Sequence, residues 1–451
     1  MSLTIFVHLS DIHFGQERDE TVHIHDDVKQ QLISDAADVV RALPGGVAHG
    51  ILVTGDIAYS GTKEQYDVAG IWLDGLAGAI GCEAYRIQMI PGNHDVDRNK
   101  MSQSSGHLLG LIRNGNASDY EQILANDQDR ASLFARFEAY ARFCEGYDCP
   151  LDVEGRYSTN LRVELNPERA LRFVRMNSSL LCTGKERHEE PELVVGARQF
   201  TVPRRNGEEV VVLLHHPLHW FKDSAEATTY LRSRARMLIT GHEHDPKATV
   251  DAVEDGCDVL LLAAGATVPF KSNETYTFTY NIIEFDWDPD KDALAVTIHP
   301  RAWNPGRTCF EADEKRLGGK DPKFVLGSPN FRKGTRQPPK AEPSLLSGAI
   351  TWEEPEPVVE IVAALDSETE SPVPPEDEGY RFALLRFFRD LSGNERLRIL
   401  AELGAFEGED SNRVTQAVER RLFDWLIKDG RLADIERLMS EFITTRKKDI
   451  G

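Results

Sequence analysis

The amino-acid sequence predicts an α/β fold over residues 1–340 and a small all-α bundle over residues 380–451. The first prediction rests on five short apolar runs, each of which ends at a glycine or a group of polar residues. The second rests on the apolar spacing after residue 380, which changes to the three- and four-residue steps of amphipathic helices. An acidic, proline-containing stretch between them, residues 341–379, is typical of a linker.

Five buried strands are predicted from apolar runs rich in β-branched residues. They are residues 4–9, 50–54, 85–90, 210–214 and 237–240. Each is followed by a short motif; in chain order these are Asp11-Ile-His13, Gly55-Asp56, Gly92-Asn93-His94-Asp95, His215-His216-Pro217 and Gly241-His242-Glu243-His244. In open α/β sheets, ligands bind at the carboxyl ends of the strands, where loops carry the chemistry. The motifs are therefore expected to form a binding site at that edge.

The five motifs in this order resemble those of the calcineurin-like metallophosphoesterase superfamily, over roughly residues 1–305. The resemblance implies a two-sheet α/β/β/α sandwich that contains a binuclear metal centre. It implies that the first metal is held by Asp11, His13, Asp56 and His244. It implies that the second is held by Asp56, Asn93, His215 and His242, with the Asp56 carboxylate bridging the pair.

Two metal ions explain why these residue types are needed. Two cations about 3.5–4 Å apart lower the pKa of a bridging water, hold the phosphoryl oxygens and stabilise the departing oxygen. The mixed carboxylate, imidazole and amide donors suit divalent or trivalent manganese, iron or zinc, and manganese is the ion we favour.

Two further residues of the third motif are candidates for catalysis. His94 is expected to donate a proton to the leaving oxygen, or alternatively to bind the substrate, and Asp95 to orient its imidazole. The ligand histidine of the family stands two residues before the proline, which selects His215 and leaves His216 to line the substrate pocket.

The motifs favour a phosphoric diester as substrate. Asn-His-Asp with His-His-Pro and Gly-His-x-His is most similar to class III cyclic-nucleotide phosphodiesterases, although related DNA repair nucleases share it. Protein phosphatases are disfavoured, because they carry Asp-Arg-Gly where this chain has Ile57-Ala-Tyr-Ser-Gly61, and Glu at the position of Asp95. A third interpretation is a partner-regulated bacterial defence effector in which the helical bundle is the main recognition element.

The net charge of −22 is unevenly distributed. Residues 341–380 hold eleven acidic and no basic side chains, and residues 381–451 hold fourteen basic and thirteen acidic ones, so residues 1–340 carry −12. This acidity counts mildly against a nuclease, which needs a basic channel for the phosphate backbone, although nucleic acid stays possible as a substrate.

An insertion at residues 97–157 is the expected selector of the substrate. Leu133, Phe137, Tyr140 and Cys144 predict an amphipathic helix within it. The insertion leaves directly from the His94 loop, so it is placed to cap the metals with Arg98, or with Lys100 or Arg113, bound to a phosphate. The alternative is a solvated helical hairpin. Further along, residues 275–287 and 293–303 alternate like strands, and residues 315–340 are basic and irregular.

The bundle is predicted from four apolar stripes, which fall within residues 384–391, 397–403, 414–426 and 432–442. The segment Leu422-Phe-Asp-Trp-Leu-Ile427, followed by Gly430-Arg-Leu432, resembles the effector-associated, death-like adaptor domains of bacterial signalling and defence enzymes. That resemblance implies a protein partner for residues 380–451; a stabilising or dimerising bundle is the alternative.

The sequence also predicts a cytoplasmic protein that does not enter a membrane. No apolar run reaches the roughly 18 residues of a membrane span, and the amino terminus lacks the basic region of a signal peptide. Six cysteines without any Cys-x-x-Cys pair suit a reducing compartment.

Overall fold

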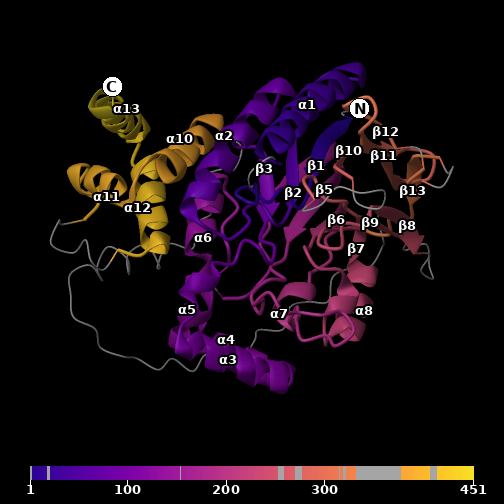
Figure 1. Ribbon diagram of the computed structural model, residues 1–451, viewed down its shortest axis with the longest axis horizontal. Helices are drawn as coiled ribbons and strands as arrows, with labels where there is room; N and C mark the ends of the chain where they lie inside the picture. The colour runs from indigo at the N-terminus through magenta and orange to yellow at the C-terminus, as the bar shows by residue number, and fades with distance from the viewer. Residues whose placement is uncertain are drawn as a thin grey trace. The chain divides into compact units, whose positions relative to one another are not determined.

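The computed structural model describes residues 3–17, 21–152, 154–251, 258–269, 277–313, 315–317, 321–331, 377–406 and 414–450 (Figure 1). The chain divides into two compact units, Met1–Lys333 and Gly334–Gly451. Most of the predicted linker, residues 341–376, lies outside the described residues.

The first sheet of the amino-terminal unit has seven strands in the order β12-β11-β10-β1-β2-β3, with β13 also paired to β11. Its strands are β1 (Thr4–Leu9), β2 (Gly50–Thr54), β3 (Ile87–Ile90), β10 (Thr279–Asp288), β11 (Ala293–Asn304), β12 (Cys309–Ala312) and β13 (Lys323–Leu326). β1, β2 and β3 run parallel, so their carboxyl ends lie at one edge.

The second sheet has six strands in the order β4-β5-β6-β7-β9-β8. Its strands are β4 (Arg162–Asn166), β5 (Arg169–Arg175), β6 (Glu208–Leu213), β7 (Ala235–Thr240), β8 (Lys247–Asp251) and β9 (Val259–Ala263). β5, β6, β7 and β9 are parallel, and antiparallel β4 and β8 close the two edges.

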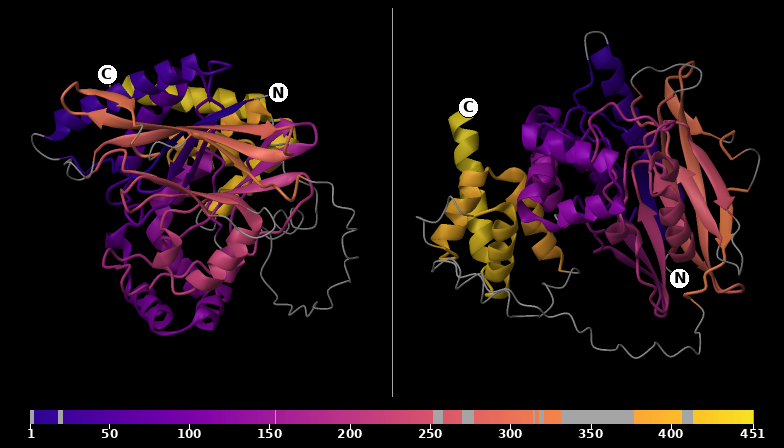
Figure 2. Two further views of the ribbon diagram at one scale, coloured as in Figure 1. Left: turned by 90° about the vertical axis from the view of Figure 1, so that its right-hand side faces the viewer. Right: turned by 90° about the horizontal axis from the view of Figure 1, so that it is seen from below.

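The two sheets pack face to face around a shared apolar core. Phe6 of the first sheet and Phe173 of the second meet with their ring centroids 5.2 Å apart, and Phe285 completes the aromatic group. Helices lie outside the sheets (Figure 2). They include α1 (Thr21–Ala42), α2 (Lys63–Ala79), the short α7 (Ala197–Phe200) and α8 (Ser224–Arg234). The predicted two-sheet sandwich is confirmed.

All five strands predicted ahead of the motifs are confirmed, as β1, β2, β3, β6 and β7. The prediction missed β5, because Arg169, Arg172 and Arg175 interrupt its apolar pattern although the whole strand is buried. These guanidinium groups find partners inside the fold; Nη1 of Arg175, for example, donates to Oδ1 of Asn160 at 2.6 Å. The irregular structure predicted after residue 315 was wrong at β13, which extends the first sheet.

The insertion after the third motif is helical and packed. It contains the 3₁₀ turns η1 (Arg98–Lys100) and η2 (Ala135–Phe137), and the helices α3 (Gln103–Asn114), α4 (Ala117–Ala125), α5 (Asp127–Phe134) and α6 (Glu138–Gly146). Leu109, Tyr120 and Phe137 share a core with Val212 of β6. A solvated hairpin is therefore the wrong alternative.

The carboxy-terminal unit is a helical bundle, as predicted. It contains α10 (Glu378–Leu385), a π-helical turn (Arg386–Asp390), α11 (Gly393–Glu402), α12 (Gln416–Lys428) and α13 (Leu432–Ile450). The apolar stripes meet in one core around Phe387 and Phe423, whose ring centroids are 4.8 Å apart. None of the helices in the described part of the chain combines the length and apolar composition that a bilayer span requires.

Candidate metal centre

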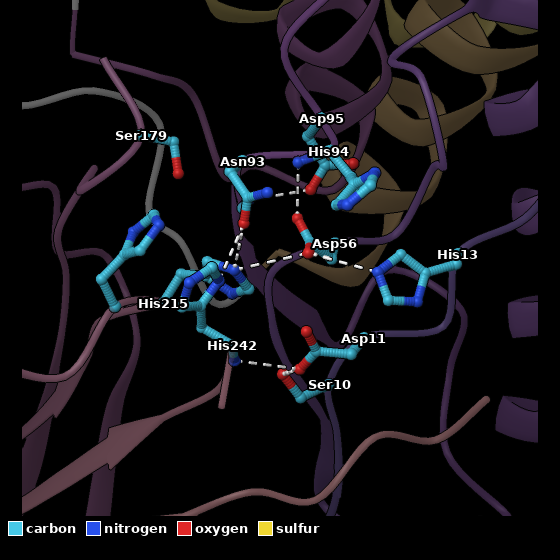
Figure 3. Close-up of polar contacts among 12 residues, drawn as sticks. Ser10, Asp11, His13, Asp56, Asn93, His94, Asp95, Ser179, His215 and His242 are labelled. Carbon is cyan, nitrogen blue, oxygen red and sulfur yellow. Dashed lines mark hydrogen bonds and ion pairs between the residues drawn. The ribbon is translucent and has the colours of Figure 1, made fainter. Parts of the chain in front are cut away.

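The five motifs meet just beyond the carboxyl ends of β1, β2, β3, β6 and β7, and the candidate ligand side chains labelled in Figure 3 are turned toward one another. Potential ligand atoms lie within 4.8 Å of one another in four overlapping groups. The groups are Asp11, His13 and His244; Asp11, Asp56 and His215; His13, Asp56 and His94; and His215, His216 and His242.

The backbone of the motif loops adopts the left-handed conformation, which side chains other than glycine usually avoid. The φ angles are 54° at Asp11, 55° at His13, 54° at Asp56, 71° at His242 and 55° at His244. Each such residue costs about 1–3 kcal/mol and persists where the surrounding structure holds it, typically at functional sites. Here the first two loops hold each other, since N–H of Asp11 donates to the carbonyl of Gly55 at 3.0 Å.

Asp56 lies at the middle of the centre. Its Oδ1 accepts a hydrogen bond from the backbone N–H of His94 at 2.7 Å. Its Oδ2 lies 3.3 Å from Nε2 of His13 and 3.5 Å from Nε2 of His215. One carboxylate oxygen therefore faces imidazoles from both predicted ligand sets.

The predicted second ligand set converges on the side-chain oxygen of Asn93. This Oδ1 lies 3.1 Å from Nε2 of His215 and 2.9 Å from Nδ1 of His242. The remaining contact belongs to the first set, in which Oδ1 of Asp11 lies 3.1 Å from Nε2 of His244. The structure thus brings together all seven residues predicted as metal ligands.

Three imidazoles are held by hydrogen bonds at Nδ1, so that each directs Nε2 toward the centre. Nδ1 of His215 lies 2.8 Å from the carbonyl of Thr54, Nδ1 of His94 lies 2.7 Å from that of Tyr59, and Nδ1 of His13 lies 3.4 Å from that of Val268. A carbonyl only accepts, so Nδ1 carries a hydrogen and Nε2 is the nitrogen that faces inward. Metal-binding histidines commonly donate their second ring N–H in this way.

Close packing requires glycine at two motif positions. A Cβ at Gly92 would lie 2.1 Å from Oδ1 of Asp56, and one at Gly241 would lie 2.2 Å from Oγ of Ser10. Any side chain at either position would displace the carboxylates of the centre or their neighbours.

The electrostatics of the centre favour a cation. Burial raises the pKa of Asp56, but the charge of His215 and a hydrogen bond from His13 outweigh burial and hold that pKa well below its usual range. Burial lowers the pKa of His215, yet the Asp56 carboxylate outweighs it and raises the pKa to about 9. Positive charge is therefore stabilised where these side chains meet, and the donors fit manganese, iron or zinc.

The predicted contact between Asp95 and His94 is wrong. Asp95 points away from the imidazole and accepts hydrogen bonds from the N–H groups of Ile57, Ala58 and Gly92 and from the hydroxyl of Tyr66. His94 is instead held by Tyr59, through the carbonyl contact and a ring stacked 5.1 Å away. Adjacent residues in this turn face different directions, so neighbouring positions in the sequence did not mean neighbouring side chains.

The prediction that His216 lines the substrate pocket is also wrong. His216 is completely buried, with Nδ1 2.9 Å from Oγ of Ser178 and Nε2 3.8 Å from Sγ of Cys182. Its ring packs 4.3 Å from that of His242, so it supports a candidate ligand from behind.

Of the three cations considered for a phosphate, two are already paired. Lys100 is ion-paired with Glu138, and Arg113 with Glu186 at 2.8 Å. Arg98 is exposed, and its guanidinium lies against the backbone of Gly184, where a Cβ would approach Cζ to 2.5 Å. Its charge acts on the nearby His94.

The sequence interpretation missed Trp220 and Glu243. Nε1 of Trp220 donates to Oε1 of Glu243 at 3.1 Å, and the indole ring packs edge-on against His242 at 4.3 Å. The role of Glu243 could have been suspected from the sequence, because this residue stands between two candidate ligands in the last motif. The carbonyls that orient the imidazoles belong to the backbone, so the pattern of side chains in the sequence does not reveal them.

Comparisons with known proteins agree with this geometry. Residues 5–246, more than half of the chain, match the family model described as calcineurin-like phosphoesterase, and residues 379–441 match that of the GTPase-associated adaptor domain. An uncharacterized metallophosphoesterase-like protein of Bacillus subtilis, YydB, is 23% identical over 310 residues. That match covers 66% of this chain and 59% of the length of YydB.

Two solved structures are among the matches. Purple acid phosphatase PPD1 from yellow lupin is 11% identical with a TM-score of 0.37, and the match covers 75% of this chain and 57% of that one. Sulfate thiohydrolase SoxB from Thermus thermophilus is 13% identical with a TM-score of 0.32, over 70% of this chain and 60% of that one.

Proposed function

Because the chain belongs to the calcineurin-like phosphoesterase family, we propose that it is a metal-dependent phosphodiesterase. The observation that carries the proposal is the position of Asp56, whose Oδ2 faces His13 on one side and His215 on the other. A carboxylate placed in this way is suited to bridge a pair of cations.

The seven candidate ligands divide into two sets that share this carboxylate. Asp11, His13, Asp56 and His244 would hold one ion, and Asp56, Asn93, His215 and His242 the other. When bound, such a pair supplies Lewis acidity, which lowers the pKa of a water, holds phosphoryl oxygens and offsets charge on the departing oxygen. Manganese is the ion we favour, with iron and zinc compatible with the same donors.

His94 is proposed as the residue that moves a proton. Its Nδ1–H is held by the carbonyl of Tyr59, so only Nε2 is directed to the substrate. A proton carried on Nε2 would pass to the leaving oxygen as its bond to phosphorus breaks. Asp95 would act as a positioning residue, since its carboxylate joins the Asp56 loop to the His94 loop.

Arg98 is proposed to bind a non-bridging phosphate oxygen. It is exposed beside His94 and rests on the loop at Gly184, whereas Lys100 and Arg113 are engaged with carboxylates. A guanidinium is well suited to bind a phosphate through two parallel hydrogen bonds.

The proposed substrate is a cyclic nucleotide or another nucleotide diester. A panel of cyclic nucleotides, single- and double-stranded DNA, RNA and phosphopeptides, offered to manganese-loaded protein, tests this choice. We expect the nucleotide diesters to be hydrolysed fastest. Rapid hydrolysis of nucleic acid alone would favour the nuclease alternative, and hydrolysis of phosphopeptides alone would contradict the diester assignment.

Residues 380–451 are proposed to bind a protein partner while residues 1–340 carry the chemistry. The match of residues 379–441 to an adaptor domain supports this division. So does the sequence, because every candidate metal ligand precedes residue 245. A partner-regulated bacterial defence effector is one form that this arrangement would take.

A further inference from the structure

Three aromatic side chains lie together beside the candidate metal centre. His219 and Trp220 belong to the 3₁₀ turn η3 (Leu218–Trp220), which begins directly after the fourth motif. His188 comes from the loop that also supports Arg98 at Gly184. The ring of His188 lies 5.6 Å from that of Trp220 and 6.1 Å from that of His219.

This aromatic group, defined as His188, His219 and Trp220, is anchored to the last motif. Oε1 of Glu243 lies 2.7 Å from Nε2 of His219 and accepts the indole N–H of Trp220 at 3.1 Å. Trp220 is 9% exposed and packs against the ring of His242. The indole thus forms a fixed support that extends from a candidate metal ligand to the surface.

The imidazoles of His188 and His219, which lie beside this indole, are exposed to solvent. The side chain of His188 is 53% exposed and that of His219 is 54% exposed. Exposed flat rings beside a phosphate site are surfaces on which a nucleobase can stack, and stacking tolerates any base.

The charge around the aromatic group argues for a neutral ligand. His219 is paired with Glu243, and Nε2 of His188 lies 3.4 Å from Oε1 of Glu189. An anionic group bound here would be repelled by these carboxylates, whereas an uncharged ring would not be repelled. The group is therefore suited to the base of a nucleotide, and Arg98, whose guanidinium lies against Gly184 of the His188 loop, is suited to its phosphate.

We propose that His188 and His219, supported by Trp220, stack on the nucleobase of the substrate and so favour phosphoesters that carry a base. This inference rests on the proposed phosphodiester chemistry, because it requires the phosphate to lie at the metal centre. It goes further in assigning recognition of the base to residues outside the five motifs.

The test compares two 5′-phosphates of ribose, one with a base and one with a hydroxyl group in place of the base. Binding of adenosine 5′-monophosphate and of ribose 5-phosphate to the manganese-loaded full chain is measured by calorimetry, so turnover is not needed. We expect the adenosine ligand to bind about tenfold more tightly. His188→Ala and His219→Ala should each remove most of this difference and leave the affinity for ribose 5-phosphate within about twofold.

Two control variants separate stacking from charge and from general surface effects. His188→Phe keeps a flat ring without a charge, so it should retain the tighter binding of adenosine 5′-monophosphate to within about threefold. His107→Ala removes an exposed imidazole from α3 and should change neither affinity.

Each result of this experiment decides between the proposals. Equal affinity for the two ligands, or an equal loss of both affinities in His188→Ala and His219→Ala, would overturn base recognition and leave the phosphodiesterase proposal standing. Failure of both ligands to bind would overturn the phosphate site as well. A tenfold preference that disappears in His188→Phe would assign the effect to charge and overturn stacking.

Discussion

The metal-centre loops and the carboxy-terminal bundle are built by opposite local rules. In the loops, five of the seven candidate ligands have left-handed backbone. Within the described residues 377–406 and 414–450, the bundle has no such residue apart from glycine. Its helices begin at ordinary caps instead; Oγ of Ser392, for example, accepts from the N–H of Glu395.

The two regions also differ in what they bury. The centre buries two carboxylates, Asp11 and Asp56, among imidazoles. The bundle buries mainly aliphatic and aromatic side chains, together with the ion pair of Arg396 and Glu419, which are 2.6 Å apart. Left-handed backbone and buried charge lower stability unless something compensates, and a bound cation would do so for the centre. In these two regions, the departure from local rules coincides with the proposed site.

The largest effect on turnover is expected at His94, the proposed proton donor, which has no counterpart in the bundle. His94→Asn should retain the metals and lower turnover by about 10²–10⁴. The loss should be smallest on bis(p-nitrophenyl) phosphate, whose leaving group needs no proton. Steady-state rates on aryl and alkyl diesters measure this, with His107→Asn as the matched control. A uniform loss would indicate positioning, and unchanged turnover would exclude His94 from the mechanism.

A smaller effect is expected at Asp95, which supports the loops without facing His94. An amide at this position offers one acceptor where the carboxylate receives four hydrogen bonds. Asp95→Asn should therefore weaken metal binding by about 10–100-fold, as loss of a supporting partner usually does. Tyr66→Phe removes only one of these bonds and should have a lesser effect. Unchanged metal affinity in Asp95→Asn, measured by titration, would contradict the positioning role.

The smallest effect is expected from removing the bundle. A chain that ends after Lys333 retains the whole amino-terminal unit and should hydrolyse bis(p-nitrophenyl) phosphate within about twofold of the full-chain rate. Phe423→Ala in the full chain is the matched control. It should destabilise the bundle by about 3–5 kcal/mol without changing the rate.

Two outcomes would reject this separation of the regions. If the shortened chain folds and binds metal but is inactive, the bundle completes the active site. If it is much faster, the bundle inhibits the amino-terminal unit, and partner binding would become the expected means of release.

The ligand residues were predictable because each lies within a few residues of a strand end, so a short motif records its position. Contacts between segments that are distant in the sequence could not be predicted, because no short motif contains both partners. The sequence did not indicate that Tyr59 holds His94, or that Ser178 and Cys182 enclose His216. β5 was missed for a related reason, since the partners that allow its arginines to be buried lie on other segments.

The central claim is that Asp56 belongs to both metal sites, and metal analysis of two variants tests it most directly. Purified Asp56→Asn and His13→Ala are loaded with manganese, dialysed and compared by elemental analysis with the wild type, which should hold two ions per chain. We expect Asp56→Asn to lose both ions and His13→Ala to lose mainly one. Two tightly bound ions in Asp56→Asn would contradict the claim.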